Sequence, residues 1–358
     1  MLAVNSTNLI DLFNDKQLAA KSIHSLAFDG SRIECEIVGR DALIESNSPG
    51  WHLTEKTILK PLGMVDADYQ LLLLAKETIY KQHANVINKV TESGFKIKAI
   101  TTLQHHSEQT HQAFRYSLLG TAIQADALEA KLNLVGELDV VLVPQSFFMT
   151  DFKLACFDMD STLIQAEVID ELAKAHGIGK QVSAITESAM RGEIDFQQSF
   201  KARMALLSGL NEQLLADIAK NLPLTSGVRP MMAKLKEKGI RTVILSGGFN
   251  YFAAHLQREL GFDAIHANAL PIVLGKVTGE TAGEIVDAEV KAKKLSEEAS
   301  AIGCALSETI AVGDGANDLK MLNKAGLGVA FWAKPIVREQ AAFSLNRVGI
   351  DGLLSFLK

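Results

Sequence analysis

Residues 154–162, with the sequence LACFDMDST, decide the fold: an apolar run typical of a buried strand leads directly into two aspartates and two hydroxyl residues. Similar apolar runs recur at 242–245, 309–312 and 328–331, and the first three of the four runs each precede a glycine- or aspartate-containing turn and a helical pattern. Strands that alternate with helices predict an α/β fold with a doubly wound, Rossmann-like parallel sheet. Because such sheets bind ligands at their carboxyl edge, the residues after each run are candidates for a functional site.

A long segment separates the first two predicted strands. Residues 166–224 are mostly helical in pattern and are too long for an ordinary crossover between parallel strands. They predict a helical cap, inserted after the first strand, over the carboxyl edge of the sheet. The sheet and its cap form one predicted domain at 151–358.

The sequence before residue 150 has a different pattern. Residues 66–147 read strand, helix, strand, strand, helix, strand, which predicts an α+β ferredoxin-like domain. Residues 1–65 show little periodicity beyond a strand pair expected around Asp29 and Gly30, and form an N-terminal extension without an assigned fold.

Composition excludes several classes of protein. The 358 residues include 42 acidic and 36 basic side chains, and no basic stripe suits a nucleic acid. No apolar stretch approaches the roughly 18 to 20 residues that span a bilayer, and the first residues lack the pattern of a signal peptide. The three cysteines are widely spaced and predict no disulfide framework. These features predict a cytoplasmic protein that binds neither nucleic acid nor membrane.

Three histidines, His105, His106 and His111, fall between the two middle strands of the ferredoxin-like pattern. A zinc site and a solvated hairpin loop are the two interpretations. The loop is favoured, because no fourth ligand stands at a usual zinc spacing.

Carboxylates follow two of the strands in the second half of the chain. Asp158 and Asp160 come directly after the first strand, and alternate residues of an extended chain point the same way. Asp314 and Asp318 follow the third apolar run and would share one helix face if a helix starts there. Helix capping is the structural alternative in both places. An all-oxygen cluster at neighbouring strand ends instead predicts a divalent cation, and such hard ligands select magnesium.

Two further features suit an anion. The residues SGG at 246–248 follow the second strand, where backbone N–H groups and a hydroxyl can approach a phosphate, although an ordinary turn explains the same residues. Lys291 lies on the apolar face of a predicted helix, four residues before Leu295, whereas Lys293 and Lys294 are expected in solvent. A lysine aimed at a core is rare unless it is paired, so the acid cluster or a phosphate is its expected partner.

The cap contains a similar anomaly. Arg203 falls within an apolar stripe that includes Phe196, Phe200 and Met204. An inward guanidinium needs an anion. A structural ion pair with a cap carboxylate is one interpretation, and a bidentate clamp on a substrate carboxylate is the other.

The ordered set of these motifs resembles a known superfamily. DMDST at 158–162, SGG at 246–248, Lys291 and GDGAND at 313–318 are similar to the four motifs of haloacid dehalogenase superfamily phosphatases. In the cap, Glu167 and MRG at 190–192, followed by Phe196 and Arg203, resemble the phosphoserine phosphatases of that superfamily. Residues 66–147 resemble the ACT-like regions that are fused to some bacterial members.

The resemblance implies a function and a set of site residues. The expected reaction is the Mg²⁺-dependent hydrolysis of O-phospho-L-serine to L-serine and inorganic phosphate, the last step of serine biosynthesis. Asp158 is the implied nucleophile, which becomes an aspartyl-phosphate, and Asp160 is the implied general acid and base. The implied metal ligands are the side chains of Asp158 and Asp314 and the backbone carbonyl of Asp160. The implied substrate-binding residues are Glu167, Met190, Phe196, Arg203, Ser246, Gly247, Lys291 and Asn317.

Three other functions share parts of this pattern. A receiver-type signalling domain also combines an acceptor aspartate, a hydroxyl residue, a lysine and magnesium, but it is near 120 residues long and has no cap. A regulator with an inactive enzyme domain is disfavoured, because every motif residue is present. The third alternative is a phosphatase that acts on another small phosphomonoester. Only the roles of Glu167 and Arg203 distinguish it from a phosphoserine phosphatase. The expected partner is a small-molecule substrate, and a homodimer is left open.

Overall fold

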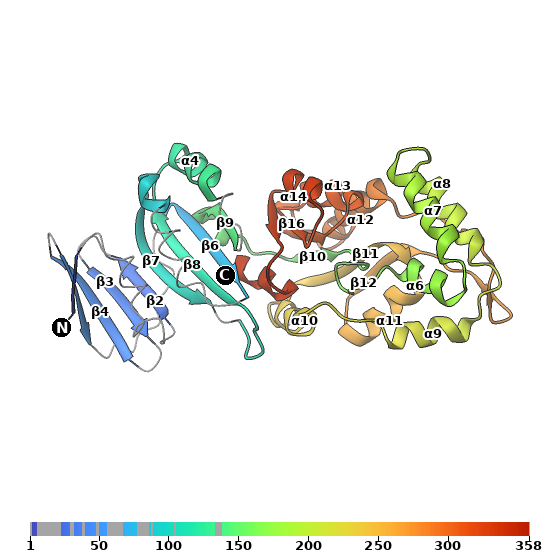
Figure 1. Cartoon of the computed structure of the whole chain (residues 1–358), viewed down its shortest axis with the longest axis horizontal. Helices are drawn as coiled ribbons and strands as arrows, with labels where there is room; N and C mark the ends of the chain where they lie inside the picture. Colours follow the sequence, from blue (N-terminus) through green and yellow to red (C-terminus); the bar gives the residue numbers. More distant parts are fainter. Residues whose placement is uncertain are drawn as a thin grey trace. The chain divides into compact units, whose positions relative to one another are not determined.

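The computed structural model describes residues 2–5, 23–28, 32–37, 40–47, 50–55, 67–76, 86, 89–103, 105–132 and 138–357. The chain divides into two compact units, one of residues 1–150 with 347–358 and the other of residues 151–346. Figure 1 labels many of the helices and strands of both units. The domain boundaries expected from the sequence stay a prediction.

The first unit is built on a nine-stranded antiparallel sheet. Its strands are β1 Leu2–Asn5, β2 Ile23–Phe28, β3 Arg32–Ile37, β4 Arg40–Asn47, β5 Gly50–Glu55, β6 Tyr69–Ala75, β7 Lys96–Leu103, β8 Gln112–Leu119 and β9 Asp139–Pro144. The order is β1-β5-β4-β3-β2-β7-β8-β6-β9. Within this sheet β7, β8, β6 and β9 lie side by side in that order, which is the strand order of a ferredoxin-like fold. The strand pair expected around Asp29 and Gly30 is confirmed by the antiparallel pairing of β2 with β3.

Three helical elements of this unit have complete bounds: α4 Ala122–Leu132, α5 Gln145–Phe148 and the 3-10 helix η3 Ile350–Phe356. The helix expected near 83–93 is described at residue 86 and at residues 89–92, which are helical. An ACT-like domain at 66–147 stays a prediction.

The histidine loop between β7 and β8 differs from the solvated loop that was expected. His111 is buried, and the Nε2 atom of His106 lies 2.9 Å from the Oδ2 atom of Asp351 in η3. The Nε2 atom of His105 lies 3.2 Å from the Ser355 hydroxyl. The sequence could not show this, because the partners are about 245 residues away along the chain. Within the described ranges, no three ligand atoms that include these histidines lie close enough together to form a metal site.

The second unit is a six-stranded parallel sheet. Its strands are β10 Leu154–Phe157, β11 Arg241–Phe249, β12 Ala264–Asn268, β15 Thr309–Gly313, β16 Leu327–Phe331 and β17 Phe343–Leu345. The spatial order is β12-β11-β10-β15-β16-β17, and every neighbouring pair is parallel. This confirms the doubly wound sheet. The direction of winding reverses between β10 and β15, and that switch point is where open α/β sheets bind ligands.

Helices cover both faces of the second sheet. They are α10 Val228–Glu237, α11 Asn250–Leu260, α12 Ala288–Ala301, α13 Leu319–Lys324 and α14 Pro335–Gln340, with the 3-10 helices η1 Leu306–Glu308 and η2 Ala316–Asp318. In Figure 1, α12, α13 and α14 lie on one side of the strands and α10 and α11 on the other. Because both faces are buried, the strands are almost continuously apolar. Leu154 and Val243, for example, pack in one core cluster with Leu295 of α12 and Met321 of α13.

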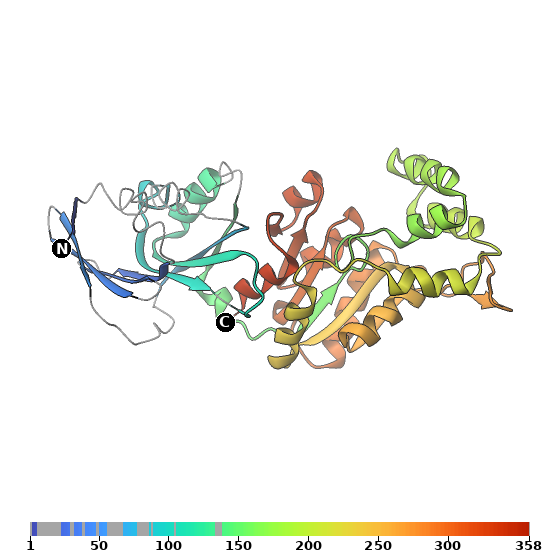
Figure 2. The same ribbon diagram turned by 60° about the horizontal axis from the view of Figure 1, so that its bottom comes forward.

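The cap predicted at 166–224 is confirmed as a helical insertion. It consists of α6 Val168–Ala175, α7 Gly179–Met190, α8 Phe196–Leu206 and α9 Glu212–Lys220, all between β10 and β11. The Asp195 side chain begins α8 by accepting a hydrogen bond from the Gln198 N–H, in a capping box. A small hairpin, β13 Ile272–Val273 and β14 Lys276–Val277, follows β12. Figure 2 shows the cap helices gathered beyond one end of the strands.

Among the described residues, every helix is too short or too polar to span a membrane.

Candidate active site

Three carboxylates meet at the switch point of the second sheet. Asp158 follows β10, and its backbone N–H donates to the Val312 carbonyl of β15. Carboxylate oxygens of Asp158, Asp314 and Asp318 lie within 4.8 Å of one another. Thr162 donates a hydrogen bond of 3.0 Å to the Asp314 carboxylate. The acids that were expected at two neighbouring strand ends are therefore brought together.

The turn after β15 differs from the one expected. Asp314 and Asp318 do not share the face of an α-helix, because η2 at Ala316–Asp318 is a 3-10 helix and α13 starts only after it. The Asp318 carboxylate instead folds back and accepts a hydrogen bond of 2.9 Å from the Gly315 N–H. A Cβ atom on Gly313 would lie 2.4 Å from the Asp318 carboxyl carbon, so only glycine fits there. The turn is what places Asp318 beside Asp314.

Lys291 is the counter-charge of this cluster. Its Nζ atom lies 2.8 Å from the Asp158 Oδ1 atom and 2.7 Å from the Asp318 Oδ1 atom, and its side chain is fully buried. Asp287 caps the helix that carries it, by accepting from the Glu289 and Val290 N–H groups. The expectation that Lys291 faces the core is confirmed. On the same helix the Lys293 side chain is 56% exposed.

The cluster carries more negative than positive charge. Desolvation, and next the neighbouring Asp318, raise the pKa of Asp158 well above its usual value. The same two causes raise the pKa of Asp314 to about 7. Burial alone would lower the pKa of Lys291, but Asp158 and Asp318 outweigh it and raise that pKa. Three carboxylates against one lysine leave a formal charge of −2, which suits a divalent cation.

Asp160 has a different environment from Asp158. Its Oδ1 atom accepts a hydrogen bond of 3.0 Å from the Val168 N–H at the start of α6, so the helix-capping alternative applies to this residue. Desolvation, and next the Glu167 charge, raise its pKa to about 7. Its other oxygen lies against Gly248, where a Cβ atom would be only 2.4 Å away. A carboxyl group that titrates near neutrality can both donate and accept a proton.

The residues SGG at 246–248 form a bulge rather than a simple turn after a strand. They lie inside β11, whose pairing with β12 shifts between Leu245 and Phe249. The Gly248 N–H donates a hydrogen bond of 2.9 Å to the Ser246 hydroxyl oxygen. The Ser246 hydrogen is thereby left for another acceptor. A Cβ atom on Gly247 would lie 3.3 Å from the Phe196 ring and 3.9 Å from the Asn317 amide, so three expected site residues converge here.

The cap residues lie on α6, α7 and α8. Arg203 is half-buried, and this desolvation lowers its pKa, while the charges of Asp170, Glu167 and Asp160 act in the opposite direction. In the part of the chain that the structure describes it forms no ion pair, and its Nε atom donates only a long hydrogen bond to the Ser199 carbonyl. The structural ion pair between Arg203 and a cap carboxylate, which was one interpretation of the sequence, is therefore absent among the described residues.

Three other cap residues were expected to contact the substrate. Glu167 accepts a hydrogen bond of 2.7 Å from the Ser161 hydroxyl. Phe196 stacks on Phe200, with 6.4 Å between the ring centroids. Met190 ends α7, and its side chain lies outside the described residues.

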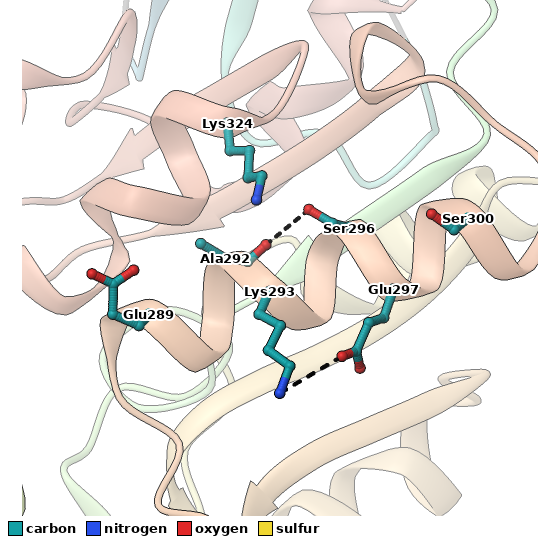
Figure 3. A pocket seen from close by; sticks show the side chains of 7 residues that line it. All are labelled: Glu289, Ala292, Lys293, Ser296, Glu297, Ser300 and Lys324. Atoms are coloured by element: carbon teal, nitrogen blue, oxygen red, sulfur yellow. Dashed lines mark hydrogen bonds and ion pairs between the residues drawn. The ribbon is translucent and has the colours of Figure 1, made fainter.

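A hollow away from this cluster lies along the outer face of α12 (Figure 3). It measures about 510 Å³ and is lined by exposed side chains such as Lys293, Glu297 and Lys324. Lys293 and Glu297 pair across it at 3.9 Å. Charges that already pair in solvent contribute little binding energy, so the chemistry is assigned to the carboxylate cluster.

Comparisons with known proteins show what the whole chain is similar to. A family model of haloacid dehalogenase-like hydrolases matches residues 152–326. A phosphoserine phosphatase of Archaeoglobus fulgidus is 44% identical over 240 residues, which cover 66% of this chain and 70% of that protein. A haloacid dehalogenase family hydrolase of Salmonella enterica serovar Typhi has a TM-score of 0.72 at 28% identity and covers 81% of this chain and 99% of its own. A phospho-aspartyl intermediate analogue of phosphoserine phosphatase has a TM-score of 0.54 at 38% identity, with 58% and 99% covered.

Proposed function

The chain belongs to the phosphoserine phosphatases among the haloacid dehalogenase-like hydrolases, and from this we propose that it hydrolyses O-phospho-L-serine to L-serine and inorganic phosphate. The observation that carries the proposal is the contact of Asp158 with buried Lys291 inside a cluster of three carboxylates. The inserted cap of α6 to α9 disfavours a receiver-type signalling domain, which has no such insertion.

The site suits Mg²⁺. Its donors are carboxylate oxygens, which are the ligands that this ion prefers. The side chains of Asp158 and Asp314 and the backbone carbonyl of Asp160 would hold it, with Asp318 beside them. When bound, the ion would neutralise the charge that the phosphate dianion adds to the cluster.

The residues divide the chemistry between two steps. An Asp158 oxygen attacks phosphorus, the bond from phosphorus to the serine oxygen breaks, and Asp160 donates the proton that the leaving oxygen needs. Water then attacks the aspartyl-phosphate, Asp160 takes its proton, and phosphate leaves with Asp158 regenerated. Lys291 stabilises the charge that develops on the phosphoryl oxygens, together with the Ser246 hydroxyl, the Gly247 N–H and the Asn317 amide.

The cap supplies the recognition of the amino acid. Arg203, which is half-buried and unpaired among the described residues, suits the substrate carboxylate. Glu167 suits its ammonium group. Phe196, beside Gly247, shields the phosphoryl group from water, and Met190 would do so from the end of α7.

Phosphate release from a panel of phosphomonoesters, with and without Mg²⁺, tests the proposal. Phosphoserine should be hydrolysed fastest, and activity should vanish when the protein is treated with a chelator and return when Mg²⁺ is added back. Without the cation, the −2 charge of the cluster repels the substrate dianion. Full activity after complete metal removal would contradict the metal assignment, and a preference for another ester would contradict the substrate.

Arg203→Ala should separate recognition of the amino acid from phosphoryl transfer. We expect KM for phosphoserine to rise by roughly 100-fold, because the variant loses a charge-assisted, bidentate hydrogen bond that contributes about 3 kcal/mol to binding. KM for p-nitrophenyl phosphate, which lacks the carboxylate, should change less than about threefold. Equal effects on both substrates would exclude the carboxylate clamp. Lys201→Ala, an exposed cation on the same helix, is the control.

A further inference from the structure

We propose that Asn268 is a positioning residue that fixes the peptide between Gly247 and Gly248, next to the proposed phosphoryl-binding groups, the Ser246 hydroxyl and the Gly247 N–H. This inference rests on the proposed phosphatase function. Asn268 ends β12 and is 3% exposed. Its Nδ2 atom donates to the Gly247 carbonyl at 2.8 Å, and its Oδ1 atom accepts from the Val286 N–H at 2.8 Å.

The bulge in β11 explains why such a residue is needed. Leu245 pairs with His266 and Phe249 pairs with Asn268, so three residues of β11, at 246–248, face a single residue of β12. Backbone pairing with β12 therefore does not fix this stretch. The Asn268 amide supplies the missing contact from β12. A side-chain hydrogen bond to this buried carbonyl replaces the backbone hydrogen bonding between the strands that the bulge interrupts.

The peptide between Gly247 and Gly248 is consequently held at both ends. Asn268 holds its carbonyl, and the Ser246 hydroxyl oxygen accepts from its N–H at 2.9 Å. With its oxygen engaged, Ser246 keeps its hydrogen for a phosphoryl oxygen. This one peptide thus links the Asn268 amide to the Ser246 hydroxyl and adjoins the Gly247 N–H.

The second hydrogen bond of Asn268 joins this peptide to the lysine helix. Val286 directly precedes Asp287, the N-cap of α12, and Lys291 lies one turn further along. The same Asn268 side chain therefore sets the separation between the Gly247 loop and Lys291. Both groups are proposed to bind the same phosphoryl group, and their spacing has to match it.

Two substitutions at Asn268 test the role. Asn268→Leu removes both hydrogen bonds at similar volume, whereas Asn268→Asp keeps the acceptor for Val286 and removes the donor to Gly247. For both variants we expect the inhibition constant of inorganic phosphate to rise roughly tenfold or more and kcat to fall by a similar factor. The inhibition constant of L-serine, which lacks the phosphoryl group, should stay within about twofold.

Asn250→Ala is the matched control. The Asn250 side chain accepts a hydrogen bond from the Leu270 N–H at 3.2 Å, two residues beyond Asn268, rather than bonding the Gly247 carbonyl. We expect this variant to leave both inhibition constants unchanged.

If Asn268 has a merely structural role, its substitution should lower the melting temperature and the active fraction but leave both inhibition constants as in the wild type. That result would overturn the proposal. A parallel rise in both constants would also overturn it. If Asn268→Leu does not fold, Asn268→Asp decides the question by the same readouts. Failure of the wild-type protein to hydrolyse phosphoserine would instead count against the proposed function.

Discussion

Asp158→Asn should abolish phosphate release, with kcat falling on the order of 10⁴-fold or more, as when other enzymes lose their nucleophile. An amide oxygen does not attack phosphorus at neutral pH, so the covalent step fails. The wild-type protein should trap a hydroxylamine-sensitive phosphoryl group from labelled phosphoserine, and the variant should trap none. The fold should survive, because asparagine keeps an oxygen within reach of Lys291, which lies 2.8 Å from the aspartate.

Two observations would count against Asp158 as the nucleophile. A variant that retains a tenth or more of the activity would show that another group attacks. Inversion of configuration at phosphorus, measured with a chirally labelled thiophosphate ester, would show a single direct attack by water. Asp217→Asn, on the exposed face of α9, is the control and should behave as the wild type.

Lys291→Met should impair both activity and stability. The substitution leaves Asp158 and Asp318 buried without their cation, and breaking a buried ion pair from one side costs about 3–5 kcal/mol. We expect the free energy of unfolding in urea, measured in the presence of a chelator, to fall by that amount. Mg²⁺ should restore part of the loss, because it neutralises the same carboxylates. Phosphate release should fall by about 10²- to 10³-fold even at saturating Mg²⁺, since one donor to the developing charge is missing.

Lys293→Met provides the comparison for this prediction. Lys293 lies two residues away on α12 and is 56% exposed, with only solvent-exposed glutamates as partners. Its loss should change the free energy of unfolding by less than about 1 kcal/mol and leave phosphate release intact. If the two lysine variants behaved alike, the buried position of Lys291 would have no functional meaning.

Much of the fold follows from local patterns in the sequence. The apolar run at 154–157, followed by Asp158, predicts a buried strand with an acid at its carboxyl end, and β10 has those bounds. Helical periodicity places Lys291 on the buried face of α12, where it lies. These predictions succeed because burial of a strand or of a helix face depends on the spacing of residues within one element.

Other features depend on contacts between distant elements. Strand order decides that β10 lies beside β15, and this brings Asp158 to Asp314. The 3-10 turn that folds Asp318 into the cluster has no periodic signal, and a helix was expected in its place. His106 likewise meets Asp351 only through the packing of the first unit.

Asn268 is the clearest example of a residue whose proposed role depends on tertiary contacts and not on local sequence. In the sequence it is one polar residue at the end of a short strand, and nothing nearby marks it. Its role arises because a bulge in β11 leaves a carbonyl unpaired 21 residues away, within reach of its amide. The sequence by itself determined which residue types stand at the strand ends and on the buried helix faces. The tertiary structure decided which of them touch, because a hydrogen bond or an ion pair depends on distances of a few ångströms that only the packed sheet and its turns define.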